Sequence, residues 1–281
     1  MIRGDKKDSD LLRHYCEALI DNIEATGRAF TSANLTKRTY LNLLRRIQHS
    51  LLGVTVQLER WPEMVELKLP ISLIFRTALT DALTGLYLAT FHEDPVALQN
   101  ELLVLDADYL KFVKTIIENT DLEMPGASAD DIAQELQTRW ADFHQKAAHL
   151  LRGPGSSEVK NPQTLRATSN PALFCVPANI SRRLGEKEMF EQIKAHPDTR
   201  HLAYFYLVQR QLSQQHHYAP ANSDFIQLPP AYDCALWFKS LASISEIAGA
   251  LASLSEAPDP VLQAFRRSQA ALLDLLADRA E

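Results

Sequence analysis

The residues most suggestive of chemistry lie in the stretch YFYLVQRQLSQQHHYAP, residues 204–220. Within about two helical turns it contains one arginine, one serine and two histidines: Arg210, Ser213, His216 and His217. At 100° per residue, one helical stripe about 60° wide carries Tyr206, Arg210, Ser213 and His217. His216 lies roughly 100° from His217, so the two histidines cannot share one role. We therefore predict that His217 acts with Arg210 and Ser213, and that His216 is their neighbour.

Two kinds of chemistry suit this polar stripe. An arginine can stabilise the charge of a phosphate, and a histidine can move a proton on a ribose 2′-hydroxyl, which together would cleave RNA without a metal. In that interpretation Arg210 and His217 are the catalytic residues. In the other interpretation the polar group is structural or binds a small anion. Its ligand-binding candidates are then Arg76, Asp81, Tyr206, Ser213 and His216.

Arg76 and Asp81 belong to the most apolar segment of the chain, residues 69–91. A buried charge needs a partner, yet residues five apart on a helix are poorly placed to pair with each other. We therefore expect each of the two to reach another helix, and Arg76 to meet the polar stripe of residues 204–220. Such a contact would either fix the register of two helices or place Arg76 in a pocket as an anion-binding group.

The spacing of Arg210 and His217 is similar to the R-x4-to-6-H pattern of the HEPN (higher-eukaryote-and-prokaryote nucleotide-binding) superfamily. Its members are helical bundles, and many are metal-independent ribonucleases of toxin and phage-defence systems. This resemblance implies RNA as a partner and a homodimer as the assembly. Arg139 and His144 fit the same pattern. Two matches are about what chance predicts for this arginine and histidine content, so the spacing alone does not decide between the two interpretations.

A second resemblance covers about residues 70–240. The segment QRQLSQQHHYAPAN resembles the late helix of a family of uncharacterised, all-helical, mostly bacterial proteins. That helix commonly reads Tyr-Arg-x-Leu-Ser, with a histidine four residues after the serine and a proline-containing loop behind it. Four residues fit this pattern: Arg210, Leu212, Ser213 and His217. Gln209 stands where the tyrosine is usual.

The same family has an earlier helix in which an arginine is followed by an acidic residue four positions later. Arg76 is similar to that arginine, although Thr80 stands at the acidic position and Asp81 comes one residue later. The resemblance implies an all-helical fold and a polar cluster of Arg76, Ser213 and His217. It implies no established activity.

Helical periodicity runs through the sequence and predicts an all-α bundle of about nine helices. Side chains suited to capping helix starts stand at six places: Ser9, Thr36, Asp94, Ser128, Asp198 and Asp259. Residues 152–179 are rich in Pro, Gly and Ser and predict a long loop. This loop would separate an N-terminal bundle of residues 1–151 from C-terminal helices of residues 180–281, which we expect to pack on it as one compact domain.

Composition narrows the classes of function. The net charge of −6 excludes a general polyanion binder, and SRRLGEK, residues 181–187, is the only basic cluster near the loop. The three cysteines are far apart and no histidines stand four apart on a helix, so we expect no metal and no cofactor. The charged N-terminus is not a secretory signal. Charges interrupt the apolar stretches 69–91 and 234–254, so we expect a cytoplasmic protein without a membrane partner.

These observations favour a binding or regulatory helical module whose Arg/Ser/His cluster is structural or holds a small anionic ligand. A HEPN-like ribonuclease of a stress or phage-defence system is the alternative. A scaffold that joins other proteins through exposed apolar faces is the third hypothesis.

Overall fold

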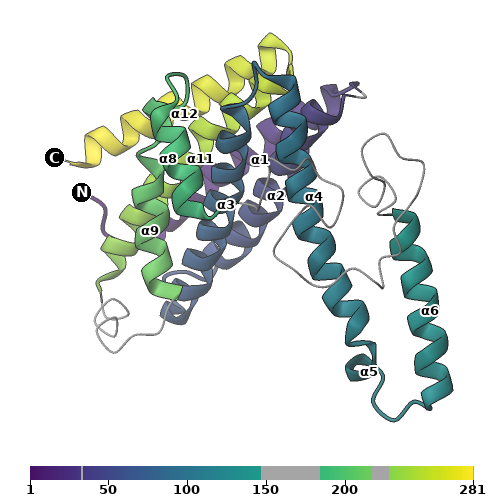
Figure 1. Cartoon of the computed structure of the whole chain (residues 1–281). Helices are drawn as coiled ribbons and strands as arrows, with labels where there is room; N and C mark the ends of the chain where they lie inside the picture. The colour runs from purple at the N-terminus through teal and green to yellow at the C-terminus, as the bar shows by residue number, and fades with distance from the viewer. Residues whose placement is uncertain (33, 147–183, 217–227, 281) are drawn as a thin grey trace. The chain divides into compact units, whose positions relative to one another are not determined.

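A computed structural model describes residues 1–32, 34–146, 184–216 and 228–280. Every regular element in these ranges is helical, which confirms the predicted all-α class (Figure 1). The α-helices are α1 (Lys6–Ala29), α2 (Leu35–Leu58), α3 (Lys68–Ala89), α4 (Pro95–Glu118), α5 (Thr120–Glu123), α6 (Ala129–Lys146), α8 (Glu186–Ala195), α9 (Phe205–His216), α11 (Pro230–Leu254) and α12 (Asp259–Ala280). Two 3-10 turns, η1 (Val65–Leu67) and η4 (Arg200–Leu202), add to them.

The described ranges hold slightly more helices than the nine or so predicted. The additional elements are short: α5 has four residues, and each 3-10 turn has three. Hydrophobic periodicity cannot show elements of this length, because they complete no more than about one helical turn. The predicted long loop at 152–179 lies outside the described residues.

The chain forms two compact units. The main unit consists of Met1–Thr90 together with Glu186–Glu281, and the second unit consists of Phe91–Gly185. This division differs from the expected split between residues 1–151 and 180–281. α8, α9 and α11 pack on α3, and α12 packs on α11 and α1, so the main unit combines the two ends of the sequence.

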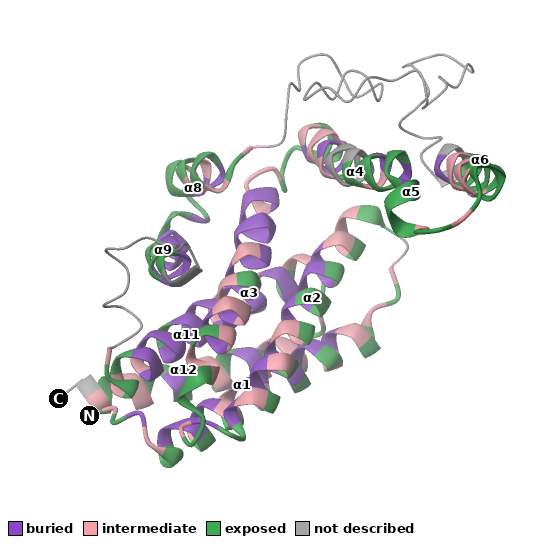
Figure 2. Cartoon of the chain, turned by 90° about the horizontal axis from the view of Figure 1, so that it is seen from below, coloured by how far each residue is buried: buried purple, intermediate pink, exposed green. Residues whose placement is uncertain are grey.

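α3 is the central helix of the main unit. It packs against α2, α11, α9 and α8, and most of its side chains are buried (Figure 2). α11 is similarly buried, and it packs against α12, α1 and α2 as well. The two helices approach closely where Gly85 faces Leu251, since a β-carbon at Gly85 would lie only 2.7 Å from Leu251 Cδ1. A small residue at this position therefore sets the spacing of the two core helices.

Two of the predicted helix starts are confirmed by their capping contacts. Asp94 accepts hydrogen bonds from the backbone N–H groups of Val96 and Ala97, and Pro95 begins α4. Ser128 Oγ accepts from Asp131 N at 3.2 Å at the start of α6. Both caps satisfy N–H groups that have no partner within the helix.

The starts of α1 and α2 correct the prediction, because another residue nearby makes the cap. Asp5 caps α1, whereas Ser9 is buried inside that helix and donates from Oγ to Leu58 O at 2.7 Å. Asn34 caps α2 by accepting from Lys37 N, so Thr36 lies within the first turn. In both cases an earlier Asp or Asn supplies the side-chain oxygen.

The starts of α9 and α12 also differ from the prediction. α9 begins at Phe205, after the turn η4, so Asp198 lies too far upstream to cap it. The backbone N–H of Asp198 instead donates to His196 Nδ1 at 3.4 Å. α12 begins at Asp259 itself, with Pro260 as the next residue.

Two ion pairs join distant parts of the main unit, Asp8 with Arg279 and Lys68 with Asp233, and we call these four residues the terminal ion cluster. The carboxylate of Asp8 accepts from the backbone N–H groups of Arg3 and Gly4 at 2.6 and 2.8 Å, and it pairs with Arg279. Lys68 Nζ lies 2.8 Å from Asp233 Oδ2, and the Asp233 side chain is fully buried. Burial alone would raise the pKa of Asp8, but the three donors outweigh it and lower that pKa.

The second unit contains α4, α5 and α6. Within it Arg139 lies 2.6 Å from Glu123 Oε2 and 2.7 Å from Glu135 Oε1, and these two carboxylates raise the pKa of the guanidinium. Arg139 is the arginine of the second R-x4-to-6-H match. Its pairing with two glutamates gives it a structural role, and the side chain of His144 lies outside the described part.

Two segments, Val65–Ala89 and Pro230–Leu254, are long and apolar enough to cross a membrane by length and composition. In each segment, 72% of an 18-residue apolar stretch is buried inside the structure. The core helices of soluble proteins are equally long and apolar, so these two segments are weak evidence for a membrane.

Candidate functional site

Arg76 reaches from α3 to α9, as predicted. Its Nε donates a hydrogen bond to Ser213 Oγ at 2.9 Å. Ser213 is fully buried and its Oγ donates in turn to the carbonyl oxygen of Gln209 at 2.9 Å. The serine hydroxyl therefore has one fixed donor and one fixed acceptor, which holds the guanidinium of Arg76 in one orientation.

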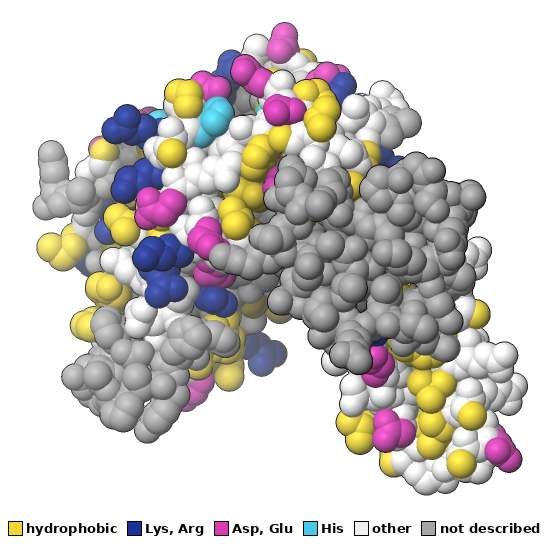
Figure 3. Space-filling model, in the orientation of Figure 1, with side chains coloured by type: hydrophobic (Ala, Val, Ile, Leu, Met, Phe, Trp, Pro, Cys, Tyr) yellow, Lys and Arg dark blue, Asp and Glu magenta, His cyan; other side chains and the backbone are white. Residues whose placement is uncertain are grey.

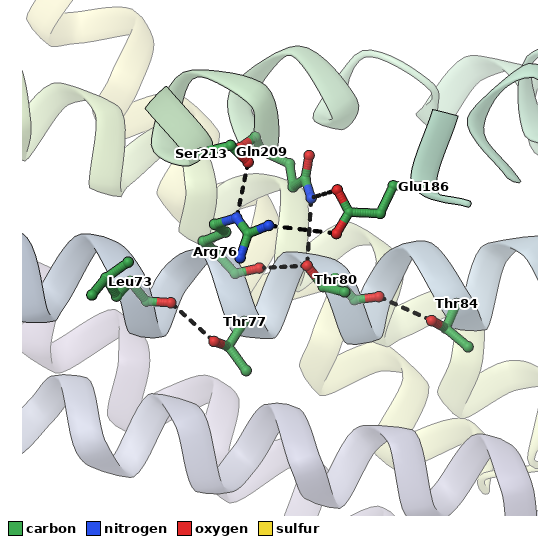
Figure 4. Close-up of polar contacts among 8 residues, drawn as sticks. All are labelled: Leu73, Arg76, Thr77, Thr80, Thr84, Glu186, Gln209 and Ser213. Carbon is green, nitrogen blue, oxygen red and sulfur yellow. Dashed lines mark hydrogen bonds and ion pairs between the residues drawn. The ribbon is translucent and has the colours of Figure 1, made fainter. Parts of the chain in front are cut away.

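The outer edge of the guanidinium faces the first residue of α8. Arg76 Nη2 lies 3.6 Å from Glu186 Oε1, and the two side chains are 24% and 32% exposed. The other carboxylate oxygen, Glu186 Oε2, accepts from Gln209 Nε2 at 2.9 Å. One carboxylate is thus bound through both of its oxygens by groups from α3 and α9 (Figure 4).

We call Arg76, Gln209 and Ser213 the arginine clamp, and Glu186 its occupant. Thr80, one helical turn beyond Arg76, supports the clamp by donating to Arg76 O at 3.0 Å and accepting from Gln209 Nε2 at 3.4 Å (Figure 4). All of these residues belong to the main unit. The geometry is that of a binding site for one carboxylate or a group of similar shape.

Gln209 is the most deeply buried part of the clamp, with no solvent exposure. Its Oε1 is buried and has no hydrogen-bond partner among the described residues. A buried carbonyl oxygen without a donor costs roughly 1–3 kcal/mol. The clamp therefore provides acceptors for the amide N–H groups of Gln209 but no donor for its carbonyl oxygen.

Asp81 does not join the clamp. Arg46 Nε on α2 donates to Asp81 Oδ1 at 2.9 Å, so Asp81 reaches another helix as predicted, but on a different side of α3. Five residues correspond to about 140° around a helix, which turns Arg76 and Asp81 to different neighbours. The structure thus separates two residues that the sequence analysis placed in one ligand-binding group.

The predicted stripe of α9 divides between two environments. Ser213 is fully buried, whereas Arg210 is exposed. Tyr206 is buried and stacks on Phe190 of α8, with ring centroids 4.2 Å apart. The stripe therefore spans the boundary between the packed face and the exposed face of α9, and Arg210 lies on the exposed side of it.

Two of the predicted residues cannot be placed. His217 lies outside the described residues. His216 is the last residue of α9, and its side chain lies outside the described part.

Glu186 and Gln209 are site residues that the sequence pattern alone does not single out. Gln209 stands where the resembling family usually has a tyrosine, and this departure supplies the buried amide of the clamp. Glu186 lies inside SRRLGEK, whose composition indicates a basic cluster. The sequence signal for Glu186 is its position at the start of a predicted helix that follows the predicted long loop. Acidic residues are favoured in the first turn of a helix because they interact well with the helix dipole.

A basic surface pocket between the end of α1 and the start of α2 was also missed. It has a volume of about 350 Å³ and contains two arginines on one face of α2, Arg38 and Arg45, with Asn42 between them. The side chains of both arginines are exposed. This pocket provides arginines for comparison with Arg76.

In the described part of the chain, thiols and metal ligands add no second site. Cys16 and Cys234 are buried free thiols; burial raises the pKa of both, that of Cys234 to about 12, which makes them unreactive. Across the described ranges, no group of three or more His, Cys, Asp or Glu side chains could hold a metal ion.

Comparison with known proteins adds no relative. No family model matches the sequence, and no curated protein or solved structure is significantly similar to it. The resemblances to the uncharacterised helical family and to the HEPN superfamily therefore stay predictions.

Proposed function

We propose that this chain is a binding or regulatory module that holds a small anionic ligand at the arginine clamp. The observation that carries the proposal is the carboxylate of Glu186, bound through both oxygens by Arg76 and Gln209. The Nε of Arg76 is fixed by a hydrogen bond and its Nη groups face outward. An arginine in this orientation is suited to bind planar anions such as carboxylates.

The energetics allow an external anion to compete. An ion pair between partly exposed side chains is worth about 0–1 kcal/mol, and a separation of 3.6 Å is long for such a pair. The Arg76–Ser213 hydrogen bond has a normal length of 2.9 Å, and it does not involve the Nη groups. Exchange of one carboxylate for another at the Nη edge would therefore leave the buried part of the clamp in place.

Calorimetric titration with acetate and with phosphate, at constant ionic strength, tests the proposal. We expect saturable binding in the millimolar range by the wild type and its loss in Arg76→Gln. Arg45→Gln is the matched control, because it removes an exposed arginine from the basic pocket and leaves the clamp intact. Binding that survives Arg76→Gln, or no saturable binding by any small anion, would contradict the proposal.

The HEPN-like ribonuclease is a second proposal, favoured by one observation. Arg210 is exposed on α9, where a phosphate could reach it. Basic and acidic side chains lie next to one another on the face in Figure 3, so no uniformly basic surface supports RNA binding there. The test is metal-free cleavage of RNA by the wild type and by Arg210→Ala and His217→Ala. Cleavage that is absent, or that survives both substitutions, would exclude this function.

A further inference from the structure

We propose that Glu186 is an internal occupant that an external ligand displaces, and that this ligand is a small carboxylate with a hydrogen-bond donor on the carbon next to the carboxylate. The inference rests on the proposed function, because it identifies the ligand class and the regulation of the same clamp. It follows from three features of Glu186 and Gln209.

The first feature is the way the carboxylate is bound. Arg76 Nη2 and Gln209 Nε2 approach different oxygens of Glu186, at 3.6 and 2.9 Å. The two donors come from different helices and converge on one planar group. A free carboxylate would find the same two donors if Glu186 turned away toward solvent.

The second feature is the unused acceptor of Gln209. Its Oε1 is buried without a partner among the described residues, next to the amide nitrogen that binds Glu186. Glu186 cannot satisfy it, because a glutamate side chain has no donor and only methylene groups next to its carboxylate. A hydroxyl or ammonium group beside a ligand's carboxylate supplies the missing donor. This chemistry is common to 2-hydroxy acids and α-amino acids.

The third feature is the position of Glu186 in α8. It is the first residue of the helix, and its side chain is 32% exposed, so it can leave the clamp without unfolding the helix. α8 stays attached to the core through buried Met189 and Ile193. Ligand binding would thus release the beginning of α8 only.

The experiment measures dissociation constants of acetate, glycolate and glycine for the wild type and for Glu186→Ala. Removal of a tethered competitor worth up to about 1 kcal/mol should tighten the binding of all three by up to about fivefold. Glycolate and glycine should bind more tightly than acetate, since they also reach Gln209 Oε1, and comparison of the two shows which donor is preferred. Glu191→Ala, an exposed glutamate of the same helix, should leave every constant unchanged.

The outcomes separate the two proposals. Binding that requires Arg76 but is unchanged by Glu186→Ala would overturn the inference and leave the proposed function standing. Equal binding of acetate, glycolate and glycine would overturn the assignment of the ligand class. Absence of carboxylate binding in both the wild type and Glu186→Ala would overturn the proposed function itself. Arg76→Lys keeps the charge and serves as the second clamp variant if Arg76→Gln does not fold.

Discussion

Two groups of charged side chains hold the main unit together, and they differ in how completely their charges are buried and paired. In the terminal ion cluster the Lys68 and Asp233 side chains are 12% and 0% exposed, and they lie 2.8 Å apart. In the arginine clamp the Arg76 and Glu186 side chains are 24% and 32% exposed, and they lie 3.6 Å apart. The pair of the first group is more deeply buried and more closely spaced, whereas the pair of the clamp is partly exposed.

The difference indicates which group can exchange its partners. Separating Lys68 from Asp233 would leave a buried carboxylate without its cation, which is too costly to happen in the folded protein. Separating Glu186 from Arg76 exposes both charges to water at little cost. The clamp also has an unused buried acceptor, Gln209 Oε1, which gives a ligand something to gain there. We therefore assign a structural role to the terminal ion cluster and a binding role to the clamp.

The largest expected effect is that of Lys68→Met in the terminal ion cluster. Loss of the ammonium removes the lysine partner of the fully buried Asp233 carboxylate, so we expect the free energy of unfolding to fall by about 3–5 kcal/mol. Urea denaturation measures it, with Lys239→Met as the control because Lys239 is exposed. A decrease in the free energy of unfolding below about 1 kcal/mol would show that the Lys68–Asp233 pair contributes no more to stability than an exposed ion pair does.

Asp8→Asn should lower the stability by about 2–3 kcal/mol near neutral pH, through weaker bonds to Arg3, Gly4 and Arg279. The folded pKa of Asp8 is lowered below its ordinary value of 3.8. Its contribution is therefore present above that value, and is lost as the pH falls through the folded pKa. Urea denaturation at successively lower pH should show the wild type converging on Asp8→Asn. A difference that does not change with pH would contradict this account.

Arg76→Gln should reduce the stability by only about 1 kcal/mol, since it removes one hydrogen bond to Ser213 and one weak ion pair. The same substitution should abolish the binding of small anions. Chemical denaturation and calorimetry on one preparation test both statements. A destabilisation as large as that of Lys68→Met would make the clamp a structural group like the terminal ion cluster.

Glu186→Ala should have the smallest effect on stability, at most about 1 kcal/mol, because the ion pair is partly exposed and Gln209 Nε2 keeps its hydrogen bond to Thr80. The same substitution should strengthen the binding of carboxylates, because it removes the side chain that competes for the clamp. A thermal unfolding midpoint close to that of the wild type, together with tighter carboxylate binding, would distinguish an occupant from a structural partner. Lower stability without a gain in affinity would identify Glu186 as a structural partner.

The sequence predicted the fold better than it predicted the site. The spacing of apolar residues is a local property, so the long helices and the caps at Asp94 and Ser128 could be derived from it. The caps of α1 and α2 were wrong because Asp5 and Asn34 compete with Ser9 and Thr36. Two candidate caps a few residues apart cannot be ranked without knowledge of which one becomes buried.

The candidate site depended on packing that one sequence does not contain. The apolar surroundings of Arg76 predicted that it would reach another helix, and the contact with Ser213 confirms this. The helical wheel placed Arg210 beside Ser213, but the edge of the packed face runs between them. Glu186 and Gln209 meet only because α8 and α9 both pack on α3.

The most direct test of the binding role of the clamp is to measure the NMR chemical shift of the Arg76 Nε–H group during a titration with glycolate. Its assignment follows from its disappearance in Arg76→Lys. We predict a saturable shift of this signal with the same dissociation constant as calorimetry gives, because the ligand replaces Glu186 at the Nη edge while Ser213 keeps its hydrogen bond. A signal of Arg76 that does not move while that of Arg38, Arg45 or Arg210 does would contradict the assignment of the anion site to the clamp.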